Sequence, residues 1–385
     1  MKWKFYSLAF VAGMSILTAC SSDDNNDNDG NGGNGNGNEI ENGTILKGTI
    51  TSDVTLAAGN TYKLSGEYIV EEGATLHIEE GVKIIAVYDD IADYILVKQG
   101  GKINAVGTPD KPIVMTSEKE EPGAWGGIHI CGRAHTNAEG GKGSSEIGGA
   151  VYGGNDDADN SGTLQYIRLE YTGFAFDEEH EANGISFYGV GNGTIVDHCQ
   201  AYKGSDDGFE FFGGSVNVSN LVAVSCSDDS FDWTEGWNGK GTNLVAYQED
   251  KSTLGYDCDC LMECDNNGSN NAATPVAHPV LKNLILVGNG GSKQGIRLRA
   301  GTEVEIDNAK VCGKGQPLTV ETALTENALK NGTSKLTNIT LTSELSSKEG
   351  IYTHADFIAV TSNKVDANLS YSSFEDIRKE CSWMN

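Results

Sequence analysis

Short runs of alternating apolar and polar residues fill most of the chain, and glycines recur between them. Residues 62–65, 75–78 and 82–85 are examples of such runs. An alternation with period two is typical of strands that have one buried face, and the glycines indicate tight turns. The pattern therefore predicts an all-β chain of short strands, which begins at about residue 44.

One acidic motif occurs twice at a short interval. The segment Ser-Asp-Asp-Gly-Phe-Glu at 205–210 recurs as Ser-Asp-Asp-Ser-Phe-Asp at 227–232, and each is followed by a strand-like run that ends in Leu-Val-Ala. A period near 22 is too short for a helical hairpin and is typical of one coil of a parallel β-solenoid. Coils stack about 4.8 Å apart, so we expect the two acidic segments to lie one above the other.

The last part of the chain has a different pattern. It predicts helices at 320–329 and 374–380, and strands at 336–342 and 357–360. A solenoid needs a cover over its open end. We therefore predict a parallel β-helix over residues 44–317, with about 22 residues per coil, and a small mixed C-terminal cap over 318–385.

Residues 1–19 predict a lipoprotein signal peptide. Lys2 and Lys4 precede an apolar segment that is too short to span a membrane, and Leu-Thr-Ala-Cys at 17–20 resembles a bacterial lipobox. Cleavage there would leave Cys20 to carry the lipid, with palmitate among its acyl chains. An ordinary secretory signal is the alternative. Residues 20–43, rich in Asp, Asn and Gly, predict a disordered tether.

Several short motifs occur in an order found in one protein family. They include Trp-Gly-Gly at 125–127, Gly-Gly-Asn-Asp at 153–156, Asn-Gly-Ile at 183–185 and the two acidic segments. Over residues 60–315 the chain thereby resembles right-handed parallel β-helix lipoproteins of the Bacteroidetes cell surface, and it is distantly similar to pectate-lyase-like β-helix proteins. The resemblance implies a right-handed solenoid, lipid-anchored in the outer membrane and facing the cell exterior. It implies no catalytic residue.

The chain is strongly acidic. It carries 55 acidic and 27 basic side chains, which give a formal net charge of −28. Such a charge repels nucleic acids and anionic membrane surfaces, so we exclude nucleic acid as a partner. We expect contact with the membrane through the N-terminal lipid only. The composition is compatible with a cation or a neutral sugar as the ligand.

Carboxylates stacked on neighbouring coils are the main candidates for a metal site. A period of 22 places Asp206, Asp228 and Asp250 in one column, and Asp207 and Asp229 in the next. Carboxylates about 5 Å apart share a proton, bridge a cation or face open water. Ca²⁺ takes six to eight oxygen ligands of this kind, so we predict calcium as the cofactor. A catalytic carboxyl pair and a solvated acidic face are the alternatives.

A second calcium candidate is an Asx-rich loop. Asp157, Asp159 and Ser161 precede Gly162 with the alternating spacing of oxygen ligands in calcium loops. The distal Glu of a complete calcium loop is absent, because Arg168 stands at its position. An ordinary Asx-rich turn is the alternative interpretation of this loop.

The candidates for catalysis are Asp228, Asp232, Glu210 and Arg297. With the neighbouring Phe side chains inward, strand alternation sends Glu210 and Asp232 outward. The carboxyl groups resemble the Asp pairs of polygalacturonase-like hydrolases, whose Gly-His-Gly element is missing here. Arg297 offers the base of a calcium-dependent lyase, but at the same period it follows Asp232 by nearly three coils. Three coils span about 14 Å. Pairing of Arg297 with Glu303 or Glu305 is the alternative.

Aromatic residues near the acidic segments are candidates for stacking on sugar rings: Trp233, Trp237, Phe211 and Tyr188. Internal stacking inside the solenoid is the alternative.

Apart from Cys20 there are eight cysteines, which in an exported protein permit disulfides whose pairing the sequence does not indicate. Cys199 occupies a position expected to be buried.

These observations favour a surface-exposed outer-membrane lipoprotein whose calcium-containing β-helix binds a glycan or another nutrient ligand without catalysis. An outer-membrane transporter is a candidate partner. The first alternative is a calcium-dependent polysaccharide lyase or a carboxylate-pair glycoside hydrolase. The second is a structural or adhesive surface protein, in which calcium would contribute to stability alone.

Overall fold

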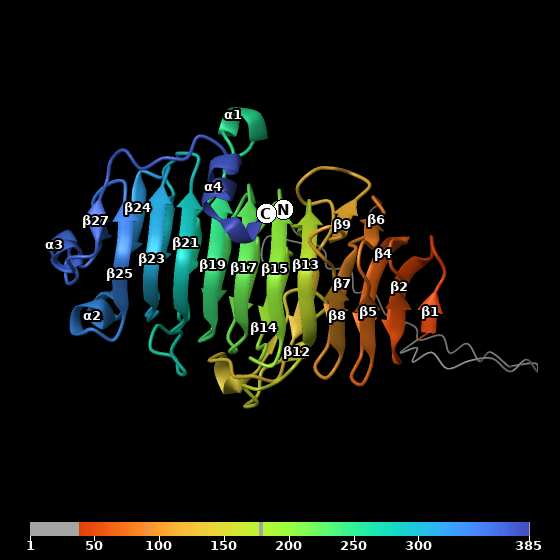
Figure 1. The fold of residues 1–385 in the computed structure, drawn as a ribbon. Helices are drawn as coiled ribbons and strands as arrows, with labels where there is room; N and C mark the ends of the chain where they lie inside the picture. Colours follow the sequence, from red (N-terminus) through yellow and green to blue (C-terminus); the bar gives the residue numbers. More distant parts are fainter. Residues whose placement is uncertain (1–37, 90, 177–179, 385) are drawn as a thin grey trace, which may run out of the picture. The chain divides into compact units, whose positions relative to one another are not determined.

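The computed structural model describes residues 38–89, 91–176 and 180–384. They form a parallel β-helix in which successive coils contribute strands to three columns (Figure 1). The predicted right-handed parallel β-helix is confirmed. The signal peptide at 1–19 and the lipidation of Cys20 concern residues outside the described part of the chain.

The first column begins with four short strands, and the second contains three: β1 (Asn38–Ile40), β3 (Val54–Leu56), β5 (Thr75–Ile78) and β8 (Lys102–Val106); then β6 (Lys83–Ala86), β9 (Ile113–Ser117) and β27 (Lys364–Val365). Seven longer strands bend across both columns: β13 (Gly162–Glu170), β15 (Ile195–Tyr202), β17 (Asn217–Val224), β19 (Lys240–Tyr247), β21 (Val280–Val287), β23 (Glu305–Cys312) and β25 (Lys335–Leu341).

The third column carries the candidate site. Its strands are β7 (Tyr94–Val97), β10 (Ile128–Cys131), β14 (Ile185–Tyr188), β16 (Phe209–Phe212), β18 (Phe231–Thr234), β20 (Met262–Cys264), β22 (Gln294–Leu298), β24 (Gln316–Val320) and β26 (Ser346–Ser347). Near the N-terminal end, β2 (Ile45–Ile50) and β4 (Thr61–Val70) run through the second and third columns. A polar insertion after β10 holds the 3₁₀ turn η1 (Glu139–Gly141) and the antiparallel pair β11 (Gly143–Ser144) and β12 (Val151–Tyr152).

Apolar side chains of successive coils stack inside the solenoid. Phe187 lies 5.0 Å from Phe211, and Phe209 lies 5.6 Å from Phe231, measured between ring centroids. These side chains are almost fully buried. Each stacked aromatic pair adds about 0.5–1.5 kcal/mol beyond the burial of its apolar area. The inward Phe residues therefore fix the register that sends their neighbours Glu210 and Asp232 outward.

The bend between the first two columns uses residues in the left-handed backbone conformation, which Asn tolerates better than most residues. Asn220, Asn243, Asn283 and Asn308 occupy it on successive coils, with φ between 56° and 63°. From Asn243 onward, each side-chain amide donates to the Asn before it, over 2.8, 3.0 and 2.8 Å. We call these four residues the asparagine ladder.

The coils are not uniform in length. Asp207 and Asp229 are 22 residues apart on adjacent coils, as the sequence predicts. On the next coil the corresponding spacing, from Asp229 to Cys260, is 31 residues. On the coil after that, the spacing from Glu263 to Arg297 is 34 residues. The helix α1 (Lys251–Leu254) lies in the longer segment after β19. The period of 22 therefore cannot be extended beyond Asp232.

Both predicted boundaries of the solenoid need correction. Strand β1 begins at Asn38 and pairs with β3, so the coils start inside the segment 20–43 that was predicted as a tether. At the other end β24, β25, β26 and β27 continue the parallel columns as far as Val365, well past residue 317.

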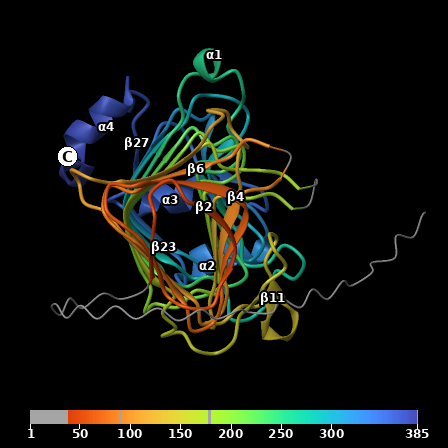
Figure 2. The same ribbon diagram turned by 90° about the vertical axis from the view of Figure 1, so that its right-hand side faces the viewer.

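The helices of the last part of the chain lie in two places. Views from two directions show α2 (Ala323–Asn331) and α3 (His354–Ala359) at one end of the coils and α4 (Phe374–Glu380) along their side (Figures 1 and 2). The predicted strand at 357–360 is wrong: Thr353 and Asp356 form a capping box that begins α3, and Phe357 enters the main core. Helix α4 has the bounds that the sequence predicts, and the 3₁₀ turn η2 (Ser382–Met384) follows it.

Candidate functional site

A line of polar side chains runs along the outer face of the third column. The strand register places Ser186 beside Glu210, Glu210 beside Asp232, Asp232 beside Glu263, and Glu263 beside Arg297. Neighbours in such a line are separated by one inter-strand spacing, about 4.8 Å. The pairing of Glu210 with Asp232, and their outward direction, agree with the prediction.

A second set of carboxylates comes from the turns that precede these strands and from two segments that lie over the column. Together they line a partly open cavity of about 350 Å³, which we call the acidic pocket. Its lining consists of ten carboxylates and one guanidinium: Glu146, Glu181, Asp206, Asp207, Glu210, Asp228, Asp229, Asp232, Asp259, Glu263 and Arg297.

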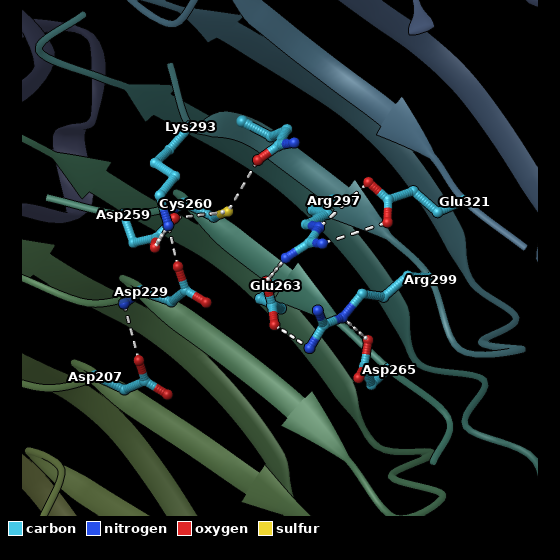
Figure 3. Close-up of polar contacts among 11 residues, drawn as sticks. Asp207, Asp229, Asp259, Cys260, Glu263, Asp265, Lys293, Arg297, Arg299 and Glu321 are labelled. Atoms are coloured by element: carbon cyan, nitrogen blue, oxygen red, sulfur yellow. Dashed lines mark hydrogen bonds and ion pairs between the residues drawn. The ribbon is translucent and has the colours of Figure 1, made fainter. Parts of the chain in front are cut away.

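Hydrogen bonds from the next coil hold two of the buried carboxylates in place. Oδ1 of Asp207 accepts the backbone N–H of Asp229 over 2.8 Å, and Oδ1 of Asp229 accepts that of Cys260 over 2.6 Å (Figure 3). On the strand, Nδ2 of Asn183 donates to Glu210 over 2.6 Å. Buried Oδ1 of Asp232 has no hydrogen-bond partner among the described residues. These contacts orient the carboxylates but do not neutralise them.

Carboxylate oxygens converge at several points in the acidic pocket. Four groups of carboxylates each contain oxygens that lie within 4.8 Å of one another: Asp207, Glu210 and Asp232; Glu181, Asp206 and Asp228; Asp207, Asp228 and Asp229; Asp229, Asp232 and Glu263. Two oxygens on one Ca²⁺ ion lie about 2.3–2.6 Å from it, so their separation cannot exceed about twice that distance. The spacing in each group therefore suits a shared cation.

The chemistry of the acidic pocket favours protons or cations on its carboxylates. Burial raises the pKa of Asp206 to about 8, that of Glu146 to about 7 and that of Asp228 to about 6, and neighbouring carboxylates add to the effect. Burial also raises the pKa values of Asp229 and Asp232 well above their usual range. Without a cation, several of these groups keep their protons near neutral pH.

Basic side chains stand at one end of the acidic pocket. Arg297 donates through Nη1 to Glu263 over 2.8 Å and pairs through Nη2 with Glu321 over 3.3 Å. Arg299 donates to Asp265 and also pairs with Glu263. The two arginines are therefore held by carboxylates on both sides (Figure 3).

The sequence placed Arg297 too far from the acids and gave it the wrong partners. It lies two coils from Asp232, not three, because the intervening coils are longer than the predicted period. Glu303 instead pairs with His278 over 2.9 Å, and Glu305 pairs with Lys335 over 2.8 Å.

Three predicted metal ligands do not join the acidic pocket. Asp250 is exposed, and its side chain caps α1 by accepting the N–H of Ser252 over 2.9 Å. The longer coil removes it from the column of Asp206 and Asp228, and Asp259 takes its place. In the Asx-rich loop, Asp157 contacts His135 over 2.6 Å and Asp159 accepts from Ser161 over 3.2 Å. Neither Asp157 nor Asp159 belongs to a converging group of possible metal ligands among the described residues.

The aromatic residues predicted to stack on a sugar are buried. Trp233, Trp237 and Phe211 are at most 2% exposed and pack in the main core, where Phe211 lies 4.2 Å from Trp237 between ring centroids. Tyr188 packs under the polar insertion, and its hydroxyl donates to Glu146 over 3.2 Å. Internal stacking, the alternative interpretation, therefore describes these rings.

The eight cysteines of the described part of the chain are all buried and free. The disulfides that an exported protein permits are thus not formed, and Cys199 is buried as expected. Cys260 follows Asp259 at the edge of the acidic pocket, and its thiol donates to the Asp259 carboxylate over 3.3 Å.

Sequence reasoning missed four lining residues: Glu146, Glu181, Asp259 and Glu263. Asp259 and Glu263 lie on the longer coil that follows Asp228 and Asp232, so a search at the period of the acidic motif passes over them. The acidic composition of 257–265 was a signal, although the three cysteines in that segment suggested disulfides instead. Glu146 and Glu181 come from segments outside the regular coils, and no periodic pattern indicates them.

Comparison with known proteins gives one match. The family described as pectate-lyase-like beta helix domain matches residues 48–384. No curated protein and no solved structure matches the chain. Within the described residues, no helix is long and apolar enough to cross a membrane.

Proposed function

The chain belongs to the pectate-lyase-like beta-helix domain family, and from this premise we propose that it is a calcium-dependent glycan-binding protein of the bacterial surface. The acidic pocket is the binding site in this proposal. Its carboxylates hold Ca²⁺, and a hydroxyl or carboxylate oxygen of the glycan completes the coordination of the ion. The protein binds the glycan without cleaving it.

The observation that carries the proposal is the excess of carboxylates in one cavity. Ten carboxylates and a single guanidinium line the acidic pocket, and Glu263 and Glu321 already engage that guanidinium. Buried like charges within 4.8 Å of one another repel strongly unless a proton or a cation lies between them. A divalent cation offsets this repulsion at a pH where protons would be lost.

The ligand chemistry favours calcium among the divalent cations. The converging groups around Asp232 offer carboxylate oxygens from three successive coils. Ca²⁺ accepts six to eight such oxygens in irregular geometry, whereas Mg²⁺ demands a near-ideal octahedron and keeps several waters. Carboxylates that belong to different coils and turns suit the more flexible ion.

Binding is favoured over cleavage because the strongest base near the acids is already engaged. A lyase of this type would need a free basic group beside the calcium-bound sugar, but Arg297 is held between Glu263 and Glu321.

The proposed location follows from the lipobox at Cys20, which predicts a lipid anchor in the outer membrane, with the binding domain facing the exterior. From there a captured glycan could pass to a transporter.

Glycan profiling with and without a chelator tests the proposal. We expect the calcium-loaded protein to retain one class of glycan without releasing products, and to lose it when calcium is removed. Asp232→Asn should abolish this retention, because it removes a carboxylate shared by two converging groups. Asp250→Asn is the matched control, since Asp250 caps α1 outside the pocket and Asn is an equally good cap. Retention that survives chelation would contradict the proposal.

One observation favours a second candidate, a carboxylate-dependent glycoside hydrolase. The pKa of Glu146 is raised to about 7 and that of Asp228 to about 6, mainly by burial, which suits a general acid at neutral pH. This candidate predicts reducing-end products whose release stops in Asp228→Asn while glycan binding remains. Product analysis of the same incubations therefore separates the two functions.

A further inference from the structure

A second cavity lies on the opposite side of the strand bend from the solenoid core. It measures about 640 Å³ and is bounded by β13, β15 and β17 on one side and by α4 and η2 on the other. The residues used in the following argument are Tyr166, Arg168, His198, Gln200, Arg378 and Trp383. We call this cavity the C-terminal groove. Its volume is within the range of roughly 300–1,000 Å³ that is typical of small-molecule sites.

The C-terminal groove begins where the asparagine ladder ends. The bend position held by Asn220 on β17 is held by His198 on β15 and by Tyr166 on β13, both with φ of 51°. A Tyr in the left-handed region is uncommon, and the strain of such residues is retained most often at functional sites. An Asn at either position would extend the ladder without this strain.

The two substituted positions form an aromatic surface. The rings of Tyr166 and His198 stack with centroids 4.5 Å apart and planes inclined by 22°. Trp383 of η2 meets His198 edge-on, with centroids 6.1 Å apart. All three side chains are half-buried, so part of each ring faces the groove. Aromatic faces of this kind contact the C–H faces of sugar rings through the same apolar and electrostatic interactions that stack rings on one another.

The lining of the C-terminal groove differs in charge from that of the acidic pocket. Two guanidinium groups, Arg168 and Arg378, line it with a single carboxylate, Glu375. Arg168 lies over the ring of Tyr202 at 4.4 Å and donates through Nη1 to Gln200 over 2.8 Å, which fixes its direction. In a chain with a net charge of −28, two guanidinium groups beside one groove offer N–H donors to an anion.

Each guanidinium of the C-terminal groove has one carboxylate neighbour. Arg168 pairs through Nε with Glu170 over 2.5 Å, and Arg378 pairs through Nη1 with Glu375 over 3.4 Å. A guanidinium has five N–H donors, so these contacts leave further donors on both side chains for a ligand. Arg297 of the acidic pocket differs, because carboxylates hold it on two sides.

We propose that the C-terminal groove binds an acidic saccharide, a sugar ring that carries a carboxylate. The ring packs on Tyr166 and Trp383, and the carboxylate pairs with Arg168 and Arg378, whose planar guanidinium groups match carboxylate geometry. This site lies on a different column from the acidic pocket and uses no metal. It therefore does not depend on the function proposed for that pocket.

The test measures binding of a tetrasaccharide of alternating glucuronic acid and N-acetylglucosamine, in excess chelator, by calorimetry and tryptophan fluorescence. The neutral reference is the tetramer of N-acetylglucosamine. We expect the acidic tetrasaccharide to bind at least tenfold more tightly than the neutral one, and chelation to leave its affinity unchanged. Equal affinity for the two probes, or no binding of either, would overturn the proposal.

Two substitutions locate the binding without damage to the fold. Tyr166→Asn and His198→Asn place in the bend the residue that the asparagine ladder already uses, so relief of the backbone strain should offset much of the lost ring stacking, and both variants should fold as the wild type does. They should nevertheless weaken the acidic tetrasaccharide roughly tenfold or more, as should Trp383→Ala. Tyr88→Ala, which changes an exposed tyrosine elsewhere (54% exposed), is the control. Unchanged affinity in all three groove variants would place the ligand elsewhere and overturn the assignment.

Discussion

The asparagine ladder and the acidic pocket place like residues one above another at the same inter-strand spacing, with opposite energetic results. In the ladder an amide both donates and accepts, so Asn243 donates to Asn220 and accepts from Asn283. Ionised carboxylates only accept, so Glu210 and Asp232 on adjacent strands cannot satisfy one another. The same backbone repeat thus gives mutual hydrogen bonds in the ladder and like-charge repulsion in the acidic pocket.

The comparison shows where the coil geometry alone does not account for the choice of residues. An amide stack needs nothing from outside the chain. A stack of buried carboxylates that outnumber their basic partners requires a proton or a cation, because most of the charged groups are removed from water without compensation. The acidic pocket is therefore the part of the solenoid where bound protons or, as we propose, a cation contribute to stability.

Removal of calcium should have the largest effect. We expect the calcium-loaded protein to exceed the chelated protein in free energy of unfolding by about 2.7 kcal/mol when free Ca²⁺ is 100 times its Kd. Thermal unfolding in calcium and in excess chelator measures the difference. An unchanged melting temperature would mean that the acidic pocket does not bind the ion.

The pH dependence of the chelated protein should be the next largest effect. Burial raises the pKa of Asp228 to about 6 and that of Asp206 to about 8, above the value of about 3.9 for an unfolded Asp. The folded state then binds more protons than the unfolded state, so stability falls as pH rises from about 4 to about 8. Denaturant unfolding at pH 5 and pH 8 measures this, and added calcium should flatten the profile. A chelated protein that is more stable at pH 8 would contradict the explanation.

Asp232→Asn should make the acidic column behave more like the amide ladder. We expect the chelated variant to gain about 1 kcal/mol, because an amide is neutral without the proton that burial makes the Asp232 carboxyl take up on folding, and it can donate to a neighbouring carboxylate. The same change should weaken calcium binding. Chemical unfolding and calcium titration of one sample test both effects, with Asp250→Asn expected to change neither.

Asn243→Asp is the reverse change and should have the smallest effect. It replaces the amide that donates to Asn220 over 2.8 Å with a second acceptor, in a half-buried position. We expect a loss of about 1 kcal/mol or less in the free energy of unfolding, and no new calcium site, because only one carboxylate is present. A variant as stable as the wild type at neutral pH would show that the ladder bonds contribute little.

The sequence predicted the fold well because coil geometry repeats locally. Alternation and the repeated acidic segments were enough to place Phe209 and Phe231 inward and Glu210 and Asp232 outward, as their pairing shows. The same periodicity failed where coils change length. It put Asp250 into a column that Asp259 occupies, since no local pattern announces the additional residues of the longer coil.

The rest of the candidate site depends on contacts that no short-range pattern encodes. Glu146 reaches the acidic pocket from an insertion, and Trp233 and Trp237 turn inward because the solenoid interior has room for large rings. The left-handed bend at Tyr166 and His198 is likewise invisible until the register places them in the column of Asn220.

The count of protons released when calcium binds tests the central claim most directly. If the carboxylates of the acidic pocket hold protons in the absence of metal, calcium must displace them. Calorimetric titration at pH 6 in two buffers of different ionisation enthalpy gives the number released. We predict release of about one proton or more, which is reduced in Asp232→Asn. Calcium binding without proton release would contradict the account, as would no binding at all.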